Sequence, residues 1–272
     1  MPYALSDVLA VTERLWPADG AESWDAPGLV AGAPGQSVSS IHLVVDAVTE
    51  SLDEAIASGA DLVIAHHPLL LFGVKSVAET HYKGSVLAKL IRSQTALLSA
   101  HTNADVVADG TSAVLAERLG LAGIRPIAPS AAPGTGIGRV GELPEAVSLG
   151  RLARTLADVL PPTAGGIRVA GSYDQPVRTV AVCGGAGDSL LAHPEVLAAD
   201  VYITADLRHH PASEAREQHL LGAGPALIDV SHWASEWLWL DTAAAQLRHE
   251  LPEASVTVSE VRTDPWDFAI VR

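Results

Sequence analysis

The sequence predicts an α/β protein of two linked lobes, in which mostly parallel or mixed sheets are flanked by helices. Three observations indicate this fold class. Short apolar runs alternate with longer helical patterns, the same rhythm restarts in the second half of the chain, and a segment dense in Gly, Pro and Ser (127–138) lies between the two halves. Strand, helix, strand in this order is typical of right-handed βαβ units.

The first half supplies its elements in order. The opening "MPYALSDVLAVTERLWP" has the apolar spacing of an amphipathic helix. Apolar runs then predict strands at 41–45, 62–65 and 96–100. Longer helical patterns predict helices at 51–59, 82–94 and 110–121. These alternating elements are expected to form one parallel sheet with helices packed on it.

The second half repeats part of this plan, because residues 178–211 parallel residues 40–68. In each segment a strand leads to a polar turn, a helical stretch with Ser-Leu, an Ala-Asp pair and a second strand. An old duplication would explain the similarity. Any two βαβ units also resemble each other in their sequence pattern, so duplication and this general likeness both stay open as explanations. We expect a first lobe over 1–129 and a second over 130–272, with the C-terminal part packing back on the first lobe.

Composition disfavours a nucleic-acid-binding protein and argues against a membrane-spanning or disulfide-bonded one. The chain has 272 residues, of which 48% are hydrophobic, and a formal net charge of −15, which opposes binding to nucleic-acid phosphates. Its apolar stretches fall short of the roughly 20 residues that cross a bilayer. One cysteine, Cys183, excludes an internal disulfide and a Cys-rich zinc site. With no signal-peptide pattern at the N-terminus, these features predict a cytoplasmic protein.

Two predicted strands of the first half end in histidines. The run "LVIA" is followed by His66 and His67, and Pro68 biases His67 out of the helical region so that the chain turns there. Neighbours within a strand face opposite sides of the sheet, so two adjacent imidazoles converge only where the strand has ended. The run "ALLSA" is followed by "HTNAD", which supplies His101 and Asp105.

A third strand end, after "PALIDV" (225–230), begins a helix. Ser231 has the residue type of a helix N-cap, and His232 and Glu236 stand four residues apart. That spacing places an imidazole and a carboxylate on one helical face. Both side chains can then reach a single metal ion.

Each strand end also has an ordinary structural explanation: a hydrogen-bonded histidine pair, a carboxylate that caps the next helix, or a solvated helical face. Their combination predicts a metal site, because functional groups gather at the carboxyl ends of parallel strands. Imidazole and carboxylate without thiolate suit Zn, Mn, Fe or Co. Even five of these six side chains are too many ligands for one tetrahedral ion with an open position, and they suit two ions about 3.5 Å apart.

These residues lie in motifs that resemble the dinuclear-metal-centre family known as GTP cyclohydrolase 1 type 2, also called the Nif-three-like family. The matching segments span nearly the whole chain in order: "SWDAPGLVAG" (23–32), "LVIAHHPLL" (62–70), "HTNAD" (101–105), "CGGAGDSLL" (183–191), "ADVYITADLRHHPASEA" (199–215), "LIDVSHWASE" (227–236) and "RTDPW" (262–266). The resemblance implies a Nif-three-like fold, a toroidal homohexamer and two divalent metal ions per chain.

The same resemblance implies which residues bind these ions: His66, His67, Asp105, His232 and Glu236. The chain departs from the family pattern at Ala205-Asp206, where Gly-Asp is usual, and at Ser231-His232, where Gly-His is usual. Neither departure removes a metal ligand. Longer relatives carry an inserted domain between the lobes, which a chain of 272 residues is expected to lack.

The expected function is metal-dependent hydrolysis of GTP or another small nucleotide, with a metal-activated water as nucleophile. A metal-dependent phosphoesterase is the competing enzyme, and a non-catalytic metal-binding scaffold is the competing class. The candidate catalytic residues are His101, which either shuttles a proton or orients its loop, and His210. In "RHHP", His210 with Arg208 and His209 either contacts an anionic substrate or forms a solvated loop.

Two further motifs have structural explanations. "CGGAGD" (183–188) follows a strand, but it lacks the G-x-G-x-x-G spacing and no P-loop lysine accompanies it, so a tight turn is expected in place of a phosphate site. Trp233 and Trp237 are four residues apart and are expected to pack in the core or at a subunit interface.

Overall fold

The computed structural model describes residues 2–270 and has the mixed α/β architecture that the sequence predicts. Its contacts divide the chain into two compact units. Unit 1 comprises the residues up to Ala104 together with Leu240–Thr263, and unit 2 comprises Asp105–Trp239 together with the residues from Asp264 on. The first boundary follows Ala104, whereas the sequence led us to expect it after residue 129, so residues 105–129 belong to unit 2.

Unit 1 is built on a five-stranded sheet with three parallel pairs and one antiparallel pair. The strands, in spatial order, are β13 (Ser255–Val258), β4 (Ser40–Val44), β5 (Leu62–Ala65), β6 (Ala96–Ser99) and β2 (Gly28–Ala31). Three of them confirm the strands predicted in the first half. β13 comes from the C-terminal part of the chain and pairs with β4, which places that part in the sheet of unit 1.

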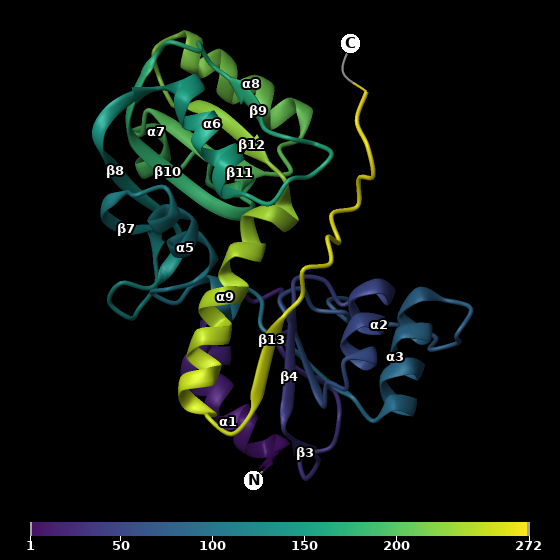
Figure 1. Ribbon diagram of the computed structural model, residues 1–272. Coiled ribbons are helices and arrows are strands. Elements are labelled where there is room, and N and C mark those ends of the chain that lie inside the picture. Colours follow the sequence, from purple (N-terminus) through teal and green to yellow (C-terminus); the bar gives the residue numbers. More distant parts are fainter. Residues whose placement is uncertain (1, 271–272) are drawn as a thin grey trace. The chain divides into compact units, whose positions relative to one another are not determined.

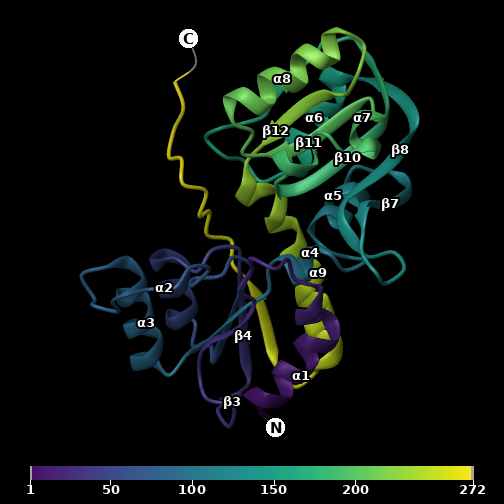
Figure 2. The ribbon, with the colours of Figure 1, turned by 180° about the vertical axis from the view of Figure 1, so that it is seen from behind.

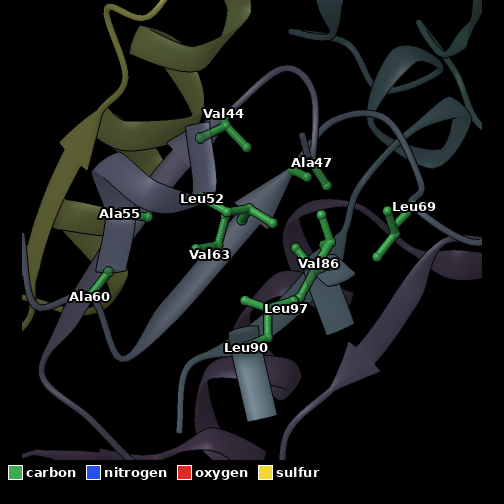
Figure 3. Packing of buried hydrophobic residues seen from close by; sticks show 11 residues of the cluster. Val44, Ala47, Leu52, Ala55, Ala60, Val63, Leu69, Val86, Leu90 and Leu97 are labelled. Atoms are coloured by element: carbon green, nitrogen blue, oxygen red, sulfur yellow. The ribbon is translucent and has the colours of Figure 1, made fainter. Parts of the chain in front are cut away.

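Helices cover both faces of the unit 1 sheet (Figures 1 and 2). One face carries α2 (Thr49–Ala57) and α3 (Tyr82–Ser93), and the other carries α1 (Leu5–Leu15) and the later turns of α9 (His232–Glu250). Figure 3 shows Leu52 of α2, Leu90 of α3 and Val63 of β5 within one buried apolar cluster. The remaining short elements are β1 (Tyr3–Ala4), β3 (Ser37–Val38), the 3-10 turn Ala18–Gly20 and α4 (Thr102–Asp105).

Unit 2 contains a six-stranded mixed sheet. In spatial order its strands are β7 (Ala122–Pro129), β8 (Gly136–Ser148), β10 (Pro176–Ala186), β11 (Val201–Ala205), β12 (Ala226–Val230) and β9 (Arg168–Ala170). The central β10, β11 and β12 are parallel, and the outer strands pair antiparallel. The Gly- and Pro-rich segment between the predicted lobes forms the turn of the β7–β8 hairpin, with Pro129 opposite Gly136.

Four helices accompany this sheet: α5 (Thr111–Arg118), α6 (Leu149–Val159), α7 (Pro194–Leu197) and α8 (His209–Leu220), with a 3-10 turn at Asp188–Leu190. Residues of α7 and α8 pack on the sheet face that carries Ala181 and Cys183. Ser231 caps α9 as predicted, since its Oγ accepts a hydrogen bond from the N–H of Ala234 at 3.2 Å. Across residues 2–270, no helix combines the length and the apolar character needed to cross a membrane.

The two units repeat one βαβ arrangement down to individual hydrogen bonds. In unit 1, Asp61 Oδ2 accepts from the N–H groups of Ser39 and Ser40 at 2.8 and 3.0 Å. In unit 2, Asp200 Oδ2 accepts from the N–H groups of Arg178 and Thr179, both at 2.8 Å. In both units, the aspartate of the Ala-Asp pair accepts hydrogen bonds from backbone N–H groups near the start of the preceding strand, β4 or β10. A duplication predicts this correspondence.

The single cysteine supplies a test of the unit 2 core. Cys183 is buried, and burial raises the pKa of its thiol to about 12, with the charge of Asp105 acting in the same direction. We expect native protein at pH 8 to resist a thiol reagent that labels the unfolded chain rapidly. Stopped-flow labelling with and without denaturant measures this, with Cys183→Ser as the control for background reaction.

The raised pKa also gives a pH dependence. An unfolded thiol loses its proton above about pH 8.5, whereas the folded one keeps it until about pH 12. The unfolded state therefore binds fewer protons in this window, so the contribution of Cys183 lowers the free energy of unfolding as pH rises through it. Urea titrations at pH 8 and pH 10 should show this loss, and Cys183→Ser should reduce it. Rapid labelling of the native protein at pH 8 would contradict the prediction.

Candidate metal centre

In unit 1, the predicted histidines follow β5 at the point where the chain leaves the sheet. The N–H groups of His66 and His67 donate to the carbonyls of Val44 and Val45 at 3.0 and 2.8 Å, so the parallel pairing continues to these residues. His66 is fully buried and His67 is partly buried. Pro68 follows at once, and the chain turns as the sequence predicts.

The structure brings His101 to this pair. Its ring centroid lies 5.3 Å from that of His66 and 5.5 Å from that of His67. One nitrogen from each of the three rings lies within 4.8 Å of one nitrogen from each of the others, a spacing at which one ion can be shared. His101 thus belongs to the ligand-capable group of unit 1, beyond the role as a nearby proton shuttle or loop residue that the sequence predicts.

All three rings are oriented in the same way, because each Nδ1 hydrogen-bonds to an oxygen acceptor. The pairs are His66 with Ala100 O at 2.8 Å, His67 with Asp46 Oδ1 at 2.7 Å, and His101 with Asp25 Oδ1 at 2.8 Å. An acceptor on Nδ1 fixes the tautomer that carries the proton there and makes Nε2 the nitrogen for a metal. Such partners are typical of metal-binding histidines.

Among these acceptors, Asp25 accepts the largest number of hydrogen bonds. Besides His101, it accepts hydrogen bonds from the N–H of Thr102 at 2.9 Å and from the Thr102 hydroxyl. Burial alone would raise the pKa of Asp25, but the hydrogen bonds from His101 and Thr102 outweigh it and hold the pKa well below its usual value. The side chain is therefore a carboxylate at neutral pH. Trp24, beside it in sequence, is half exposed and meets the His101 ring edge to face at 5.8 Å.

In unit 2, His232 and Glu236 occupy the first turns of α9 and face each other, with His232 Nε2 at 3.0 Å from Glu236 Oε1. The predicted i, i+4 pair on one helical face is confirmed. His232 Nδ1 lies 2.8 Å from Asp206 Oδ2, so this fourth histidine repeats the orientation of the three in unit 1. Asp206 follows β11 in a left-handed conformation with φ of 56°, which aspartate tolerates better than most residues.

The charge state of this pair follows from its surroundings. Burial by itself lowers the pKa of His232, but the charge of Glu236 and the hydrogen bond with Asp206 more than compensate and raise the pKa well above its usual value. The pair is an imidazolium beside a buried carboxylate. A divalent cation would replace the ring proton and neutralise the same carboxylate.

Gly185 of "CGGAGD" makes room for this pair. Its φ is +69°, and a Cβ at this position would lie 2.3 Å from Glu236 Oε1 and 3.1 Å from His232 Nε2. The N–H of Gly185 donates to Ser235 Oγ at 2.9 Å. Gly185 lies in the last part of β10, where the pairing with β11 shifts register between Val182 and Ala186, so an irregular strand end stands where the sequence predicts a tight turn. This strand end accommodates the side chains of α9.

Asp105 stands at the start of unit 2 and accepts a hydrogen bond from the Thr111 hydroxyl. The N-cap of α5 is Gly110. Asp105 therefore does not cap this helix, which was the structural alternative to a role as a metal ligand. Arg139 fixes the chain that follows Asp105: its guanidinium donates to the carbonyl of Val107 at 2.5 Å, and it is 1% exposed. Sequence reasoning missed Arg139, since nothing local marks a buried arginine.

The second catalytic prediction, His210, lies in the first turn of α8. Its ring is 5.3 Å from that of His209, and no residue of the helix is buried. Arg208 forms an ion pair with Asp188 at 2.5 Å. A role for these residues in substrate binding stays a prediction. Trp233, by contrast, is buried as expected for a packing residue.

The donor sets fit divalent metals of the first transition row and zinc. Three imidazoles in unit 1 and an imidazole with a carboxylate in unit 2 are ligands for these ions, and the one thiol is buried in the core. The acceptors on Nδ1, namely Asp25, Asp46 and Asp206, are the residues that sequence reasoning did not assign. Asp25 lies within the quoted segment "SWDAPGLVAG", which was the available signal for it.

Several bacterial proteins that share one name align with nearly the whole chain. A Streptomyces coelicolor protein named GTP cyclohydrolase 1 type 2 homolog is 48% identical over 270 residues, which cover 96% of this chain and 93% of the relative. A Mycobacterium tuberculosis protein of the same name is 34% identical and covers 98% of both chains. That alignment runs over 378 positions, so the relative contains sequence that this chain of 272 residues lacks.

Solved structures share the fold. A Bacillus cereus protein related to NIF3 superposes with a TM-score of 0.89 at 23% identity, over 99% of this chain and 100% of the other. A Staphylococcus aureus hypothetical protein superposes with a TM-score of 0.88 at 25% identity and the same coverage. A family model matches residues 3–265. The chain belongs to the Duf34/NIF3 (NGG1p interacting factor 3) family.

Proposed function

We propose that this protein is a dinuclear metal-dependent hydrolase whose two divalent ions are bound by His66, His67, Asp105, His232 and Glu236. The observation that supports it best is the shared orientation of the histidines, each of which has Nδ1 on an oxygen acceptor.

When bound, two such ions supply an activated water as nucleophile and polarise an oxygen of the substrate. The chain provides the proton transfer. We assign His101 to proton transfer and not to a metal ion, although its position would allow either role. Held through Nδ1 by the ionised Asp25, it would exchange a proton with the substrate through Nε2, and Asp25 would stabilise the charge that develops on the ring. His210 is proposed as a contact for an anionic part of the substrate.

The proposed substrate is GTP or another nucleotide. Its support is the name that both relatives carry, GTP cyclohydrolase 1 type 2 homolog. With a formal charge of −15, the protein would rely on bound cations and a few local basic groups to attract an anionic nucleotide. We also propose a homohexameric assembly, which the family resemblance implies, and a cytoplasmic location, which fits a chain with a single buried cysteine.

Elemental analysis beside a hydrolysis screen tests the proposal. We expect about two metal ions per chain in the reconstituted native protein, by analogy with two-metal hydrolases, together with hydrolysis of GTP. The double variant His66→Ala, Glu236→Ala should lose both. His249→Ala, Glu260→Ala is the matched control, because it removes the same residue types from exposed positions.

The outcomes separate the alternatives. Native protein without stoichiometric metal after reconstitution would contradict the metal centre itself. Bound metal with turnover of simple phosphoesters and none of GTP would identify the phosphoesterase. Bound metal without turnover on any substrate would identify a metal-binding scaffold, and the catalytic part of the proposal would then be wrong.

A further inference from the structure

The C-terminal segment Trp266–Ile270, here called the tail, exposes an unusual apolar pattern. Trp266, Phe268 and Ile270 occupy alternate positions and are 68%, 78% and 79% exposed. The segment has neither helix nor strand and runs as the extended yellow stretch of Figure 1. Alternate side chains of an extended chain share one side, so the tail presents three large apolar groups together. Such a group on a surface marks a site of interaction.

Unit 2 contains a pocket of matching character. Its volume is about 540 Å³, within the range of about 300–1,000 Å³ that ligand pockets span. Its walls come from α6, the loop after α6, β9 and the start of α9, and include Ala153, Arg154, Pro162, Val169, Tyr173 and Ser231. Most of the lining is apolar. Arg154, which hydrogen-bonds to the Tyr173 hydroxyl at 3.1 Å, supplies a positive charge at the pocket.

The pocket also adjoins a strand edge. β9 is the outermost strand of the unit 2 sheet, and Val169 of β9 lines the pocket and is 42% exposed. An edge strand offers backbone groups to an extended partner. Peptides that add to such an edge use the backbone for affinity and place alternate side chains in pockets for specificity. The pattern of the tail meets both requirements.

The start of the tail is fixed at the rim of this pocket. Ser231, a lining residue, donates a hydrogen bond from its hydroxyl to Asp264, and the N–H of Trp266 donates to Asp264 Oδ1 at 3.1 Å. From this anchored start, the apolar side chains of the tail remain exposed beside a pocket in the same unit.

We infer that the tail of one copy of this chain binds the unit 2 pocket of a second copy. Trp266 and Phe268 would fill the apolar part of the pocket beside β9, and Asp267 between them would point away from the pocket into solvent. Each copy both donates a tail and accepts one. Such a contact joins different surfaces of the two partners, so it closes either as a reciprocal pair or as a ring. The inference does not depend on the metal centre.

Site-directed cross-linking tests this contact between copies. The one natural cysteine, Cys183, is buried, so we expect disulfides to form only between the introduced cysteines. Chains with Ala153→Cys in the pocket and chains with Phe268→Cys in the tail, carrying tags of different mass, are co-expressed and oxidised. We expect a disulfide-linked heterodimer. Ala269→Cys in place of Phe268→Cys is the matched control, because its side chain points to the other side of an extended tail, and it should cross-link at least several-fold less.

A second measurement uses sedimentation. Trp266→Ala, Phe268→Ala should reduce the mass of the native assembly, whereas Leu220→Ala, Leu221→Ala removes two exposed apolar residues elsewhere in unit 2 and should not. Three outcomes would overturn the inference. They are equal cross-linking by Phe268→Cys and Ala269→Cys, an unchanged assembly after loss of the tail side chains, and an exclusively intramolecular bond when Ala153→Cys and Phe268→Cys share one chain.

Discussion

Replacing Arg139 with alanine is expected to lower the free energy of unfolding by about 3–5 kcal/mol, because each buried carbonyl left without its donor costs about 1–3 kcal/mol. The guanidinium is buried and donates to four backbone carbonyls, those of Gly136, Gly138 and Val107 at 2.5 to 2.8 Å and that of Ala108 at 3.5 Å. Alanine leaves these carbonyls without their donor and opens a cavity of the size of the lost side chain. Urea unfolding followed by tryptophan fluorescence measures the change.

Two companion variants sharpen this test. Arg118→Ala removes an exposed arginine from α5 and should change stability by less than about 0.5 kcal/mol. Arg139→Lys keeps the charge but offers one nitrogen in place of a planar fork, so it should recover only part of the loss. A loss below about 1 kcal/mol in Arg139→Ala would show that the carbonyls find other partners. Because Arg139 also fixes the chain after Asp105, Arg139→Ala should bind metal more weakly even below the urea transition.

Replacing Gly185 with alanine is expected to weaken metal binding by about 100-fold, the upper end of what disturbing a ligand's surroundings costs. The added methyl group would lie 2.3 Å from Glu236 Oε1, so the carboxylate must move. The residue also has a φ of +69°, which strains any side chain. Competition against a chromophoric chelator measures the affinity.

The neighbouring glycine provides the control for this substitution. At Gly184 an added Cβ would lie 3.3 Å from the Thr111 hydroxyl oxygen, and φ is outside the left-handed region. Gly184→Ala should therefore retain most of its metal affinity. Equal affinities for Gly185→Ala and the native protein would show that Glu236 contributes little to metal binding, and would count against its assignment as a ligand.

The sequence was sufficient for the strand ends and for the spacing of the candidate ligands, because both depend on local patterns. The run before His66 is short and apolar, and His232 and Glu236 need only helical periodicity to face each other. The partners that orient the rings depend on tertiary structure. Asp46 is 21 positions from His67 and Asp25 is 76 positions from His101, distances over which no periodicity connects two residues.

The division of the chain was harder to predict for a related reason. A stretch rich in Gly and Pro looks the same whether it links two domains or turns between two paired strands. Here it turns between β7 and β8, where the pairing of Pro129 with Gly136 decides its role. The helix α9 contributes His232 to unit 2 and its last turns to unit 1, and no compositional signal marks a helix that two units share.

The position of β13 has a consequence for the order of events on the ribosome. This strand pairs with β4 in the register Ser255 to Ser40, residues that stand 215 positions apart. At about 5–20 residues per second, the ribosome needs roughly 10–40 s to make the intervening chain. During that time β4 is an open edge, while every strand of unit 2 is completed. The nascent chain must therefore protect β4 from wrong pairing, by chaperone binding or by delayed collapse, until its last strand arrives.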